Sequence, residues 1–475
     1  MNNKEKLKLI FLAIIFFLAL VAGLFSPGKY FKADKAQAAG INGVLRVHPE
    51  NPRYFTNDSG KAIYLTGSHT WDVFKDMDSV YPPGAFDYAG FLDFLNSKNH
   101  NFFRMWTWEL TKYQCGTSPV RYVEPWPWQR TGPGIGHDGQ LKFDLTKFNQ
   151  SYFDRLRSRI IAARDRGIYV GVMLFEGYGD QFCEKTLGGS PFDIHNNING
   201  IDSYPTEPYT LNDQAILAAQ KNYANKVVDT VNDLDNVLYE IANEAGSSSV
   251  SWQYSMINHV KNYESGKPKK HPVGMTFPYK GAVNSDLFNS PADWISPNHV
   301  TTDDYRNNPP ANTGAKVILS DTDHLWGIGG DRIWVWKTFL RGHNPIYMDD
   351  LKTDAAKEGA RLAMGHTLNY ANKMNLVSMT PSNSLASTTY CLANPGKEYL
   401  VYQPSTGAFT VNLQAGTYSY EWFNPVTGKV AGTGNIIAST GNRSFTPPFS
   451  GDAVLYIKKS SDTAAPSAPS GFSVR

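Results

Sequence analysis

Eight short apolar runs, which alternate with helix-like stretches, constrain the fold of this chain more than any other feature. They lie between residues 60 and 350: Ile63–Gly67, Phe102–Trp106, Tyr169–Phe175, Val237–Ala242, Pro272–Phe277, Trp294–Pro297, Lys316–Ser320 and Pro345–Met348. Near-continuous apolar runs are typical of parallel strands that are covered on both faces. Because eight such strands close a barrel, we predict an α/β fold, a (β/α)8 TIM barrel over residues 43–375.

Three of the intervening stretches carry apolar residues at helical spacing. They are Tyr88–Ser97, Tyr152–Arg166 and Ala215–Leu234. This spacing predicts helices that pack one face against the outside of the barrel. The fifth and sixth units are the shortest.

The pattern changes after about Lys373. Short alternating runs follow one another between Gly, Pro and Asn turns: Tyr399–Tyr402, Ala408–Leu413, Thr417–Phe423, Gly434–Ala438 and Ala453–Ile457. This pattern predicts a C-terminal antiparallel β-sandwich over residues 376–459. We expect residues 460–475 to be a linker and the start of a truncated β-module.

The amino terminus has the features of an export signal. Lys4, Lys6 and Lys8 precede an apolar run over Ile10–Phe25, and the small-x-small sequence Ala36-Gln-Ala38 follows. We predict a signal peptide over residues 1–38, a secreted bacterial protein, and no stable membrane anchor after cleavage. Removing this segment changes the net charge from +2 to −2. No basic patch indicates a nucleic-acid partner.

The chain has three cysteines, so at most one internal pair can form. Cys115 and Cys183 both fall in loops on the same predicted face of the barrel, and an exported protein can oxidise them. They are our candidate pair. No cysteine or histidine spacing indicates a zinc site, and we predict neither a metal nor an organic cofactor.

Polar and charged side chains follow most of the predicted strands. They are His69 and Trp71 after the first, Arg104, Trp106, Trp108 and Glu109 at the second, Glu176 after the third, Asn243 and Glu244 after the fourth, His299 after the sixth, Asp321, Asp323, His324 and Trp326 after the seventh, and Asp349 after the eighth. In a barrel the carboxyl ends of all strands meet at one rim, where active sites lie. Surface loops also contain such residues, but their convergence favours a functional site.

Two carboxyl groups that face each other across a sugar are the minimum for glycoside hydrolysis. Strands four and seven lie on opposite sides of the barrel mouth, so Glu244 and an acid from Asp321-Thr-Asp323 would flank a bond. We predict Glu244 as the acid/base and Asp321 as the nucleophile or base, with Asp323 as the alternative. Arg104 would hold the second carboxylate ionised. Its other interpretation is a structural ion pair.

The remaining rim residues have two interpretations each. We predict that Asn243, His69 and His299 bind sugar hydroxyls, although either histidine could be structural. Glu109, Glu176 and Asp349 would bind hydroxyls or orient Arg104. The tryptophans would be sugar platforms or core residues: Trp71, Trp106, Trp108, Trp126, Trp128 and Trp326.

Three of these features resemble the clan A glycoside hydrolases: Asn101-Phe-Phe-Arg104, Asn243-Glu244 and the acid after strand seven. In that clan the Asn-Glu glutamate is the acid/base and a strand-seven glutamate is the nucleophile. The resemblance therefore implies hydrolysis of a polysaccharide or oligosaccharide with Glu244 as the acid/base. This chain departs from the clan in having aspartate after strand seven. The shorter side chain widens the gap and favours inversion unless the backbone sits closer; we expect retention.

Four segments resemble more narrowly the apiosidase-like barrels of secreted bacterial polysaccharide-degrading enzymes. They are Tyr64–Trp71, Val237–Gly246, Asp321–Trp326 and Phe339–Asp349. Tyr390–Tyr402 and Trp422–Gly428 resemble the small domain that often follows them and is labelled collagen-binding. Together the resemblances cover about residues 43–458.

Two other functions compete with hydrolysis. The barrel could be an inactive scaffold that only binds polysaccharide, or the C-terminal domain could bind a matrix protein; fold alone does not decide between them. For that domain we favour support of the barrel. The sequence specifies neither the sugar nor the oligomeric state.

Overall fold

The computed structural model of the chain describes residues 40–183, 188–203 and 208–460. The chain divides into two compact units, Met1–Gly40 and Ile41–Arg475, and the description below concerns the second. The predicted signal peptide, and all but Ser460 of the predicted linker and β-module, lie outside the described residues. In the described part of the chain, no helix is both long and apolar enough to span a membrane.

Eight parallel strands form the barrel. Their order is β3 (Gly67–His69), β15 (Asn344–Met348), β14 (Val317–Asp321), β13 (Trp294–Ser296), β12 (Val273–Thr276), β11 (Val237–Asn243), β10 (Tyr169–Glu176) and β5 (Phe102–Met105). All eight predicted strands are found, and the predicted fold class is confirmed. β10 and β11 are buried along their whole length, as expected for strands covered on both faces.

The register of the strands brings their carboxyl ends level. Glu176 pairs with Asn243 across β10 and β11, and Asp321 pairs with Ile346 across β14 and β15. The first strand lies later than predicted, at Gly67–His69 instead of Ile63–Gly67, and His69 pairs with Met348. His69 is therefore part of the barrel wall, and its side chain is buried.

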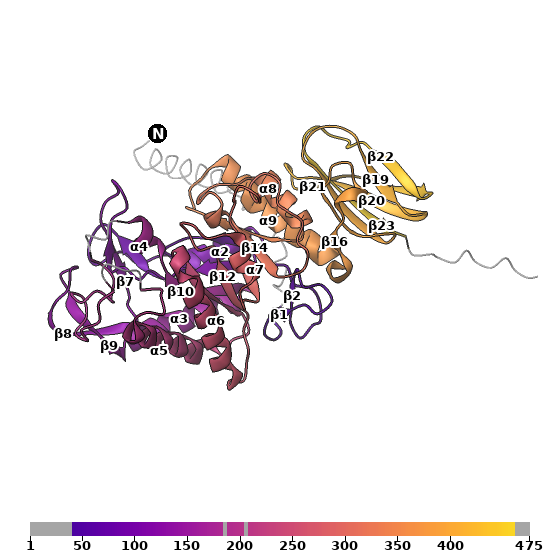
Figure 1. Ribbon diagram of the computed structural model, residues 1–475. Coiled ribbons are helices and arrows are strands. Elements are labelled where there is room, and N and C mark those ends of the chain that lie inside the picture. The colour runs from indigo at the N-terminus through magenta and orange to yellow at the C-terminus, as the bar shows by residue number, and fades with distance from the viewer. Residues whose placement is uncertain (1–39, 184–187, 204–207, 461–475) are drawn as a thin grey trace, which may run out of the picture. The chain divides into compact units, whose positions relative to one another are not determined.

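Six longer helices accompany the strands (Figure 1): α2 (Tyr88–Ser97), α3 (Gln150–Arg164), α5 (Gln214–Val231), α6 (Val250–Ser265), α8 (Arg332–Leu340) and α9 (Ala355–Lys373). Shorter helical segments are α4 (Tyr178–Phe182), α7 (Asn284–Phe288), η2 (Ser247–Ser249), η3 (Thr322–His324), η4 (Leu376–Ser378) and η5 (Asn383–Leu385). The predicted helices match α2, α3 and α5 to within three residues at each end. Aspartate side chains cap several of them; Asp213, for example, accepts hydrogen bonds from the first turn of α5.

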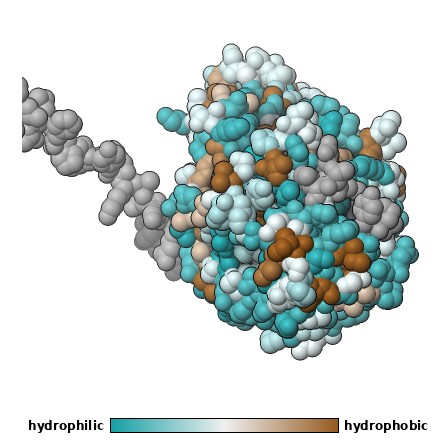
Figure 2. Space-filling model, turned by 90° about the vertical axis from the view of Figure 1, so that its left-hand side faces the viewer, coloured by the Kyte–Doolittle hydropathy of each residue, from teal (hydrophilic) through white to brown (hydrophobic). Residues whose placement is uncertain are grey.

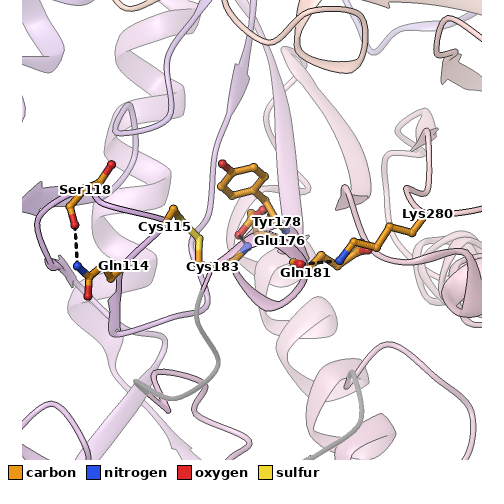
Figure 3. Close-up of a disulfide and its surroundings, with 9 residues drawn as sticks. Gln114, Cys115, Ser118, Glu176, Tyr178, Gln181, Cys183 and Lys280 are labelled. Atoms are coloured by element: carbon orange, nitrogen blue, oxygen red, sulfur yellow. Dashed lines mark hydrogen bonds between the residues drawn. A yellow bond between two sulfur atoms is a disulfide. The ribbon is translucent and has the colours of Figure 1, made fainter.

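An insertion after β5 adds short antiparallel elements beside the barrel. They are β6 (Lys112–Tyr113), β7 (Arg121–Glu124), β8 (Trp128–Ile135) and β9 (Leu141–Phe148). β4 (Asp76–Asp78), from the segment between β3 and α2, pairs with β7, and a two-residue pair, β1 (Arg46–Val47) and β2 (Phe55–Thr56), precedes the barrel. The disulfide between Cys115 and Cys183 joins this insertion to the end of α4, as predicted (Figure 3). Cys391 is free and buried.

The C-terminal domain contains two antiparallel sheets. The larger has the order β16 (Thr380–Pro381), β17 (Cys391–Asn394), β18 (Glu398–Gln403), β23 (Ala453–Lys459), β20 (Gly416–Asn424) and β21 (Lys429–Ala438), and the smaller pairs β19 (Phe409–Leu413) with β22 (Gly441–Phe445). The antiparallel domain is thus confirmed. One face of the larger sheet packs in a common core with α8 and α9 of the barrel.

Candidate active site

Arg104 is at the centre of the polar cluster at the carboxyl ends of the strands. Its guanidinium is buried and donates to Glu240 on β11 (2.8 and 2.5 Å), to Asp321 and Asp323 (2.9 Å each), and to Asn243 (2.6 Å). Burial alone would lower the pKa of Arg104, but the Glu240 and Asp321 charges raise it well above its usual value. Arg104 is therefore a permanent cation that joins strands two, four and seven.

Asp321 is surrounded by donors. One oxygen accepts from His69 Nε2 (2.9 Å) and from the backbone N–H of Asp323 (3.0 Å), and the other accepts from Arg104 (2.9 Å). Burial opposes ionisation of Asp321, yet His69 and Arg104 hold its pKa below the usual range. With 1% of its surface exposed, Asp321 is a buried, ionised carboxylate, both of whose oxygens accept hydrogen bonds.

The contacts of His69 define its tautomer. Trp106 Nε1 donates to His69 Nδ1 at 2.9 Å. Because an indole N–H can only donate, Nδ1 must carry a lone pair and Nε2 the proton. His69 is therefore a neutral donor to Asp321, held in place by Trp106, whose ring also lies 5.4 Å from the Arg104 guanidinium.

Asp323 is in a different environment from Asp321. The strand ends at Asp321, which caps the short helix η3, so Asp323 lies on that helix and not on a continued strand. One of its oxygens accepts from Arg104, while Oδ1 has no hydrogen-bond partner among the described residues. Burial raises the pKa of Asp323 to about 6, and the neighbouring Asp321 charge adds to this effect while Arg104 opposes it.

Glu244 follows β11 with a backbone φ of +46°, a left-handed conformation that is unusual for a non-glycine residue. Its backbone oxygen accepts from the Gln181 side chain, and a Cβ on Gly177 would meet Ala245 Cα at 2.6 Å. Burial, then the charges of Asp323 and Glu176, raise the pKa of Glu244 well above its usual value. Such strain and such a shifted carboxyl group are common at functional sites.

Asn243 precedes Glu244 and is fully buried. Its Oδ1 accepts from Arg104 and from His324 Nε2 (3.1 Å), which places the amide nitrogen on the other side. That nitrogen has no partner within the described part of the chain. It is a buried N–H donor without an acceptor among these residues. His324 is neutral: burial lowers its pKa to about 3, and Ser296 lies 2.9 Å from its Nδ1.

Glu176 and Glu109 form a second, adjacent group of acids. Glu176 accepts from the backbone N–H groups of Tyr178 and Gly179 at the start of α4, and burial raises its pKa well above the usual value. Burial also raises the pKa of Glu109 to about 8, and Tyr209 donates to it at 2.9 Å. Both side chains therefore have partners within the protein. They support α4 and the wall beside Glu244.

The predicted sugar platforms are largely core residues. Trp106, Trp108, Trp126 and Trp128 are each at least 96% buried, and Trp108 stacks on Tyr113 with ring centroids 4.9 Å apart. Trp71 is half-buried, and Trp326 is 38% exposed. Of the six predicted platforms, Trp71 and Trp326 are the ones with substantial surface for a ligand.

Two predicted residues have partners away from the cluster. Asp349 is fully buried in a two-pronged ion pair with Arg361 of α9 (2.8 and 2.5 Å), so its carboxylate is not available to a substrate. His299 lies 3.3 Å from Asp304 in the loop after β13.

Sequence reasoning missed Glu240, Tyr178 and Tyr279. Glu240 is the main partner of Arg104, and a signal for it existed, because a charge inside a buried strand needs an opposite charge. Tyr178 and Tyr279 lie close enough to Glu244 for its charge to raise the pKa of both hydroxyls, after the larger effect of burial. Tyr178 lies just after β10 and Tyr279 just after β12, and the paths of these segments cannot be predicted from the spacing of apolar residues.

The comparisons with known proteins agree with this architecture. The family described as "putative collagen-binding domain of a collagenase" matches residues 377–457. A comparison with curated protein sequences finds no match. A solved structure described as a glycoside hydrolase is similar at 13% identity and a TM-score of 0.58, over 88% of this chain and 97% of its own. A glycoside hydrolase family 5 structure from Bacteroides vulgatus ATCC 8482 has the same identity and TM-score, over 88% and 94%. The chain therefore shares the fold of these proteins.

Proposed function

We propose that this protein is a secreted glycoside hydrolase that cleaves a polysaccharide or oligosaccharide with two carboxyl groups. The observation that carries the proposal is a pair of buried, electrostatically interacting acids at one barrel rim, Glu244 and Asp323. Burial and the charge of Asp323 raise the pKa of Glu244 well above its usual value, which favours its protonated form, and the pKa of Asp323 is about 6. A protonated acid and an ionised carboxylate are the two partners that glycoside hydrolysis requires.

Glu244 is the general acid and base in this mechanism. It protonates the leaving oxygen, and afterwards it removes a proton from water. No side-chain hydrogen bond to another described residue occupies its carboxyl group. The Gln181 side chain donates to the backbone oxygen of Glu244 and so helps to hold this residue in place.

The second carboxylate is Asp323 in our proposal, with Asp321 as the alternative that position along the strand predicted. Both oxygens of Asp321 already accept hydrogen bonds, two at Oδ1 from His69 and the Asp323 backbone and one at Oδ2 from Arg104, so an attack by either oxygen would disturb them. Asp323 keeps Oδ1 for the sugar. The Asp323 charge is also the first electrostatic cause, after burial, of the raised pKa of Glu244. We propose retention, in which the two carboxyl groups lie close together, and the effect of the Asp323 charge on Glu244 supports such an arrangement.

In this mechanism several neighbouring residues bind the sugar or position the catalytic groups. Asn243 Nδ2 donates to a ring hydroxyl, and Arg104, His69 and His324 hold the acids and the amide in position. Trp71 and Trp326 offer exposed aromatic surface, and Tyr178 and Tyr279 lie beside Glu244. The site as proposed uses no metal or organic cofactor.

The C-terminal domain supports the barrel in our proposal. Tyr402, Phe423 and Tyr456 of its larger sheet are buried in the core shared with α8 and α9, so they are not free to bind a matrix protein.

The test is sugar release from a panel of plant and bacterial polysaccharides by residues 39–459. Asp323→Asn and Glu244→Gln should each lower kcat by about 10²–10⁴-fold. Asp321→Asn should lower it less and also lower the melting temperature, because it removes an acceptor that three donors share. Glu50→Gln, a change at an exposed surface position, is the matched control.

The outcomes separate the alternatives. Full activity in Asp323→Asn with loss in Asp321→Asn would return the second role to Asp321. Binding of polysaccharide without release by any variant would favour the inactive scaffold. Proton NMR of the first anomer released distinguishes retention from inversion.

A further inference from the structure

Two histidines and an aspartate come together away from the strand-end cluster. His137 lies in the turn between β8 and β9, and Asp193 and His195 lie in the loop of residues 188–203. Among the described residues, these three side chains have ligand atoms that all lie within 4.8 Å of one another. The two imidazole ring centroids are also 4.8 Å apart. The sequence did not signal this group, because His137 is distant in sequence from the other two.

Hydrogen bonds hold both backbone segments in position. Asn196 Oδ1 accepts from the His137 backbone N–H (2.9 Å), and its Nδ2 donates to Ser190 O (2.8 Å). Asn197 Nδ2 donates to Asp193 O at 2.9 Å. The turn and the loop are therefore joined by side chains that are not themselves ligands, and the backbone that carries the ligands is held in place.

The side chains are also placed for a shared ligand. A Cβ on Gly188 would meet the His137 ring at 2.4 Å, so the ring lies directly over the glycine backbone and is kept beside the loop. His195 Nδ1 lies 2.9 Å from Asp193 Oδ1. The His195 side chain is 67% exposed and that of Asp193 is 12% exposed. This half-open arrangement lets an ion enter from solvent.

The surrounding surface does not obstruct such an ion. β8, β9 and α4 lie on the left of Figure 1, and Figure 2 shows that face as mostly hydrophilic, with small separate apolar patches. Ile135, Leu141 and Ile194 are exposed apolar residues of this region. With Ile198 of the same loop, they are single exposed apolar residues, which are ordinary on a protein surface.

We propose that His137, Asp193 and His195 bind a divalent transition-metal ion of the zinc type. Imidazole nitrogens select such ions over Mg²⁺ and Ca²⁺, which prefer oxygen ligands only. At metal–ligand distances of about 2.1 Å, tetrahedral ligand atoms lie about 3.4 Å apart. Closing from 4.8 Å requires small rotations of exposed histidines, and water completes the coordination.

The bound ion would cross-link the β8–β9 hairpin to the loop of residues 188–203. The two are already in contact where Trp128 meets Phe192, with ring centroids 5.5 Å apart. The loop also accepts a hydrogen bond at Gly189 O from Thr111, close to Glu109 in sequence. The ion would therefore stabilise the insertion beside the barrel rim. This role does not depend on the proposed hydrolysis.

The experiment is titration of the untagged chain with Zn²⁺ in competition with a chromophoric chelator, followed by thermal unfolding. We expect one equivalent to bind and the melting temperature to rise. His137→Ala and His195→Ala should each weaken binding at least about 10-fold and remove the rise in melting temperature. Asp193→Asn, which keeps an acceptor for the His195 backbone, should weaken binding and leave the melting temperature in EDTA unchanged.

His259→Ala is the matched control, because His259 is on α6 and bonds to Asn225 instead. Co²⁺ in place of Zn²⁺ should give the visible absorption of an imidazole-bound ion in the unaltered chain and in this control. Absence of Zn²⁺ binding by the unaltered chain would overturn the proposal. So would binding that survives both His137→Ala and His195→Ala in chains that melt normally in EDTA.

Discussion

At the scale of single residues, the single positive charge of Arg104 is outnumbered by the carboxyl groups around it. One guanidinium faces Glu240, Asp321 and Asp323, and Glu244 is close to the last two. Glu240 accepts two hydrogen bonds from Arg104, and Asp321 accepts from Arg104, His69 and the Asp323 backbone. Burial, together with the remaining uncompensated negative charge, therefore raises the pKa values of Asp323 and Glu244 above those of exposed carboxyl groups.

This imbalance predicts a bell-shaped dependence of kcat/KM on pH. Hydrolysis needs Asp323 ionised, and the pKa of Asp323 is about 6, so activity should rise as the pH increases through 6. Activity should fall at higher pH, where Glu244 ionises. Because the two acids interact, the two apparent pKa values of the profile belong to the pair and not to either residue alone. A profile that is flat between pH 4 and 7 would contradict this assignment.

Glu244→Gln should stabilise the protein while it inactivates it. The raised pKa of folded Glu244 means that above its unfolded pKa the native state holds a proton that the unfolded chain has lost. The free energy of unfolding therefore decreases as the pH rises. Glutamine has no such proton, and we expect a gain of about 0.5–2 kcal/mol at pH 7.

That gain should disappear at pH 3, where glutamate is protonated in both states. Urea unfolding at the two pH values measures it, with Glu50→Gln as the control. Equal gains at both pH values would show that the effect does not come from ionisation.

At the scale of elements, the sequence predicted what periodicity controls. Tyr88–Ser97 was predicted to the residue, because its apolar positions repeat along one helix face. β17 and β22 were missed, because Gly441–Phe445 has few apolar residues and Cys391–Asn394 is short. The strand-end residues were predicted from topology, but the turn into η3 was not. That turn, which separates Asp321 from Asp323, depends on a side-chain cap.

The disulfide should affect activity through α4. Cys183 ends this helix, whose Gln181 holds the Glu244 backbone and whose first N–H groups bind Glu176 (Figure 3). Cys115→Ser with Cys183→Ser removes a link across 68 residues. We expect a loss of about 2–4 kcal/mol in the free energy of unfolding and a lower kcat at temperatures where the protein is still folded.

Thermal unfolding and single-temperature kinetics of this double variant measure the two effects. Dithiothreitol should reproduce both in the unaltered chain and change neither in the variant. An unchanged kcat in the variant would mean that α4 keeps its position without the disulfide.

At the scale of the whole second unit, the two domains share one core. Trp336 of α8 stacks on Tyr402 of β18 with ring centroids 6.0 Å apart, and Arg332 binds Asp452 through two hydrogen bonds (3.0 and 2.9 Å). The contact thus combines a buried apolar cluster with an ion pair. The barrel helices α8 and α9 and the larger C-terminal sheet therefore bury each other's apolar faces.

A chain that ends at residue 375 should consequently aggregate, because the outer faces of α8 and α9 lose their cover. Trp336→Ala in the longer chain should lower the free energy of unfolding by about 3–5 kcal/mol. Val430→Ala, on the exposed edge strand β21, should change it by no more than about 0.5 kcal/mol. Chemical unfolding and light scattering measure these outcomes. A soluble, cooperatively folded barrel without the C-terminal domain would contradict this dependence.

The pairing of β3 with β15 also has a consequence for biosynthesis. Leu65 and Thr66 bond to Asn344 and Pro345, 279 residues later in the chain. A ribosome that adds about 5–20 residues per second needs roughly 15–60 s to make this stretch. During that interval the first strand has no partner on that side, and the nascent barrel stays open. If the chain is exported as proposed, such a delay would keep it open for translocation before it folds.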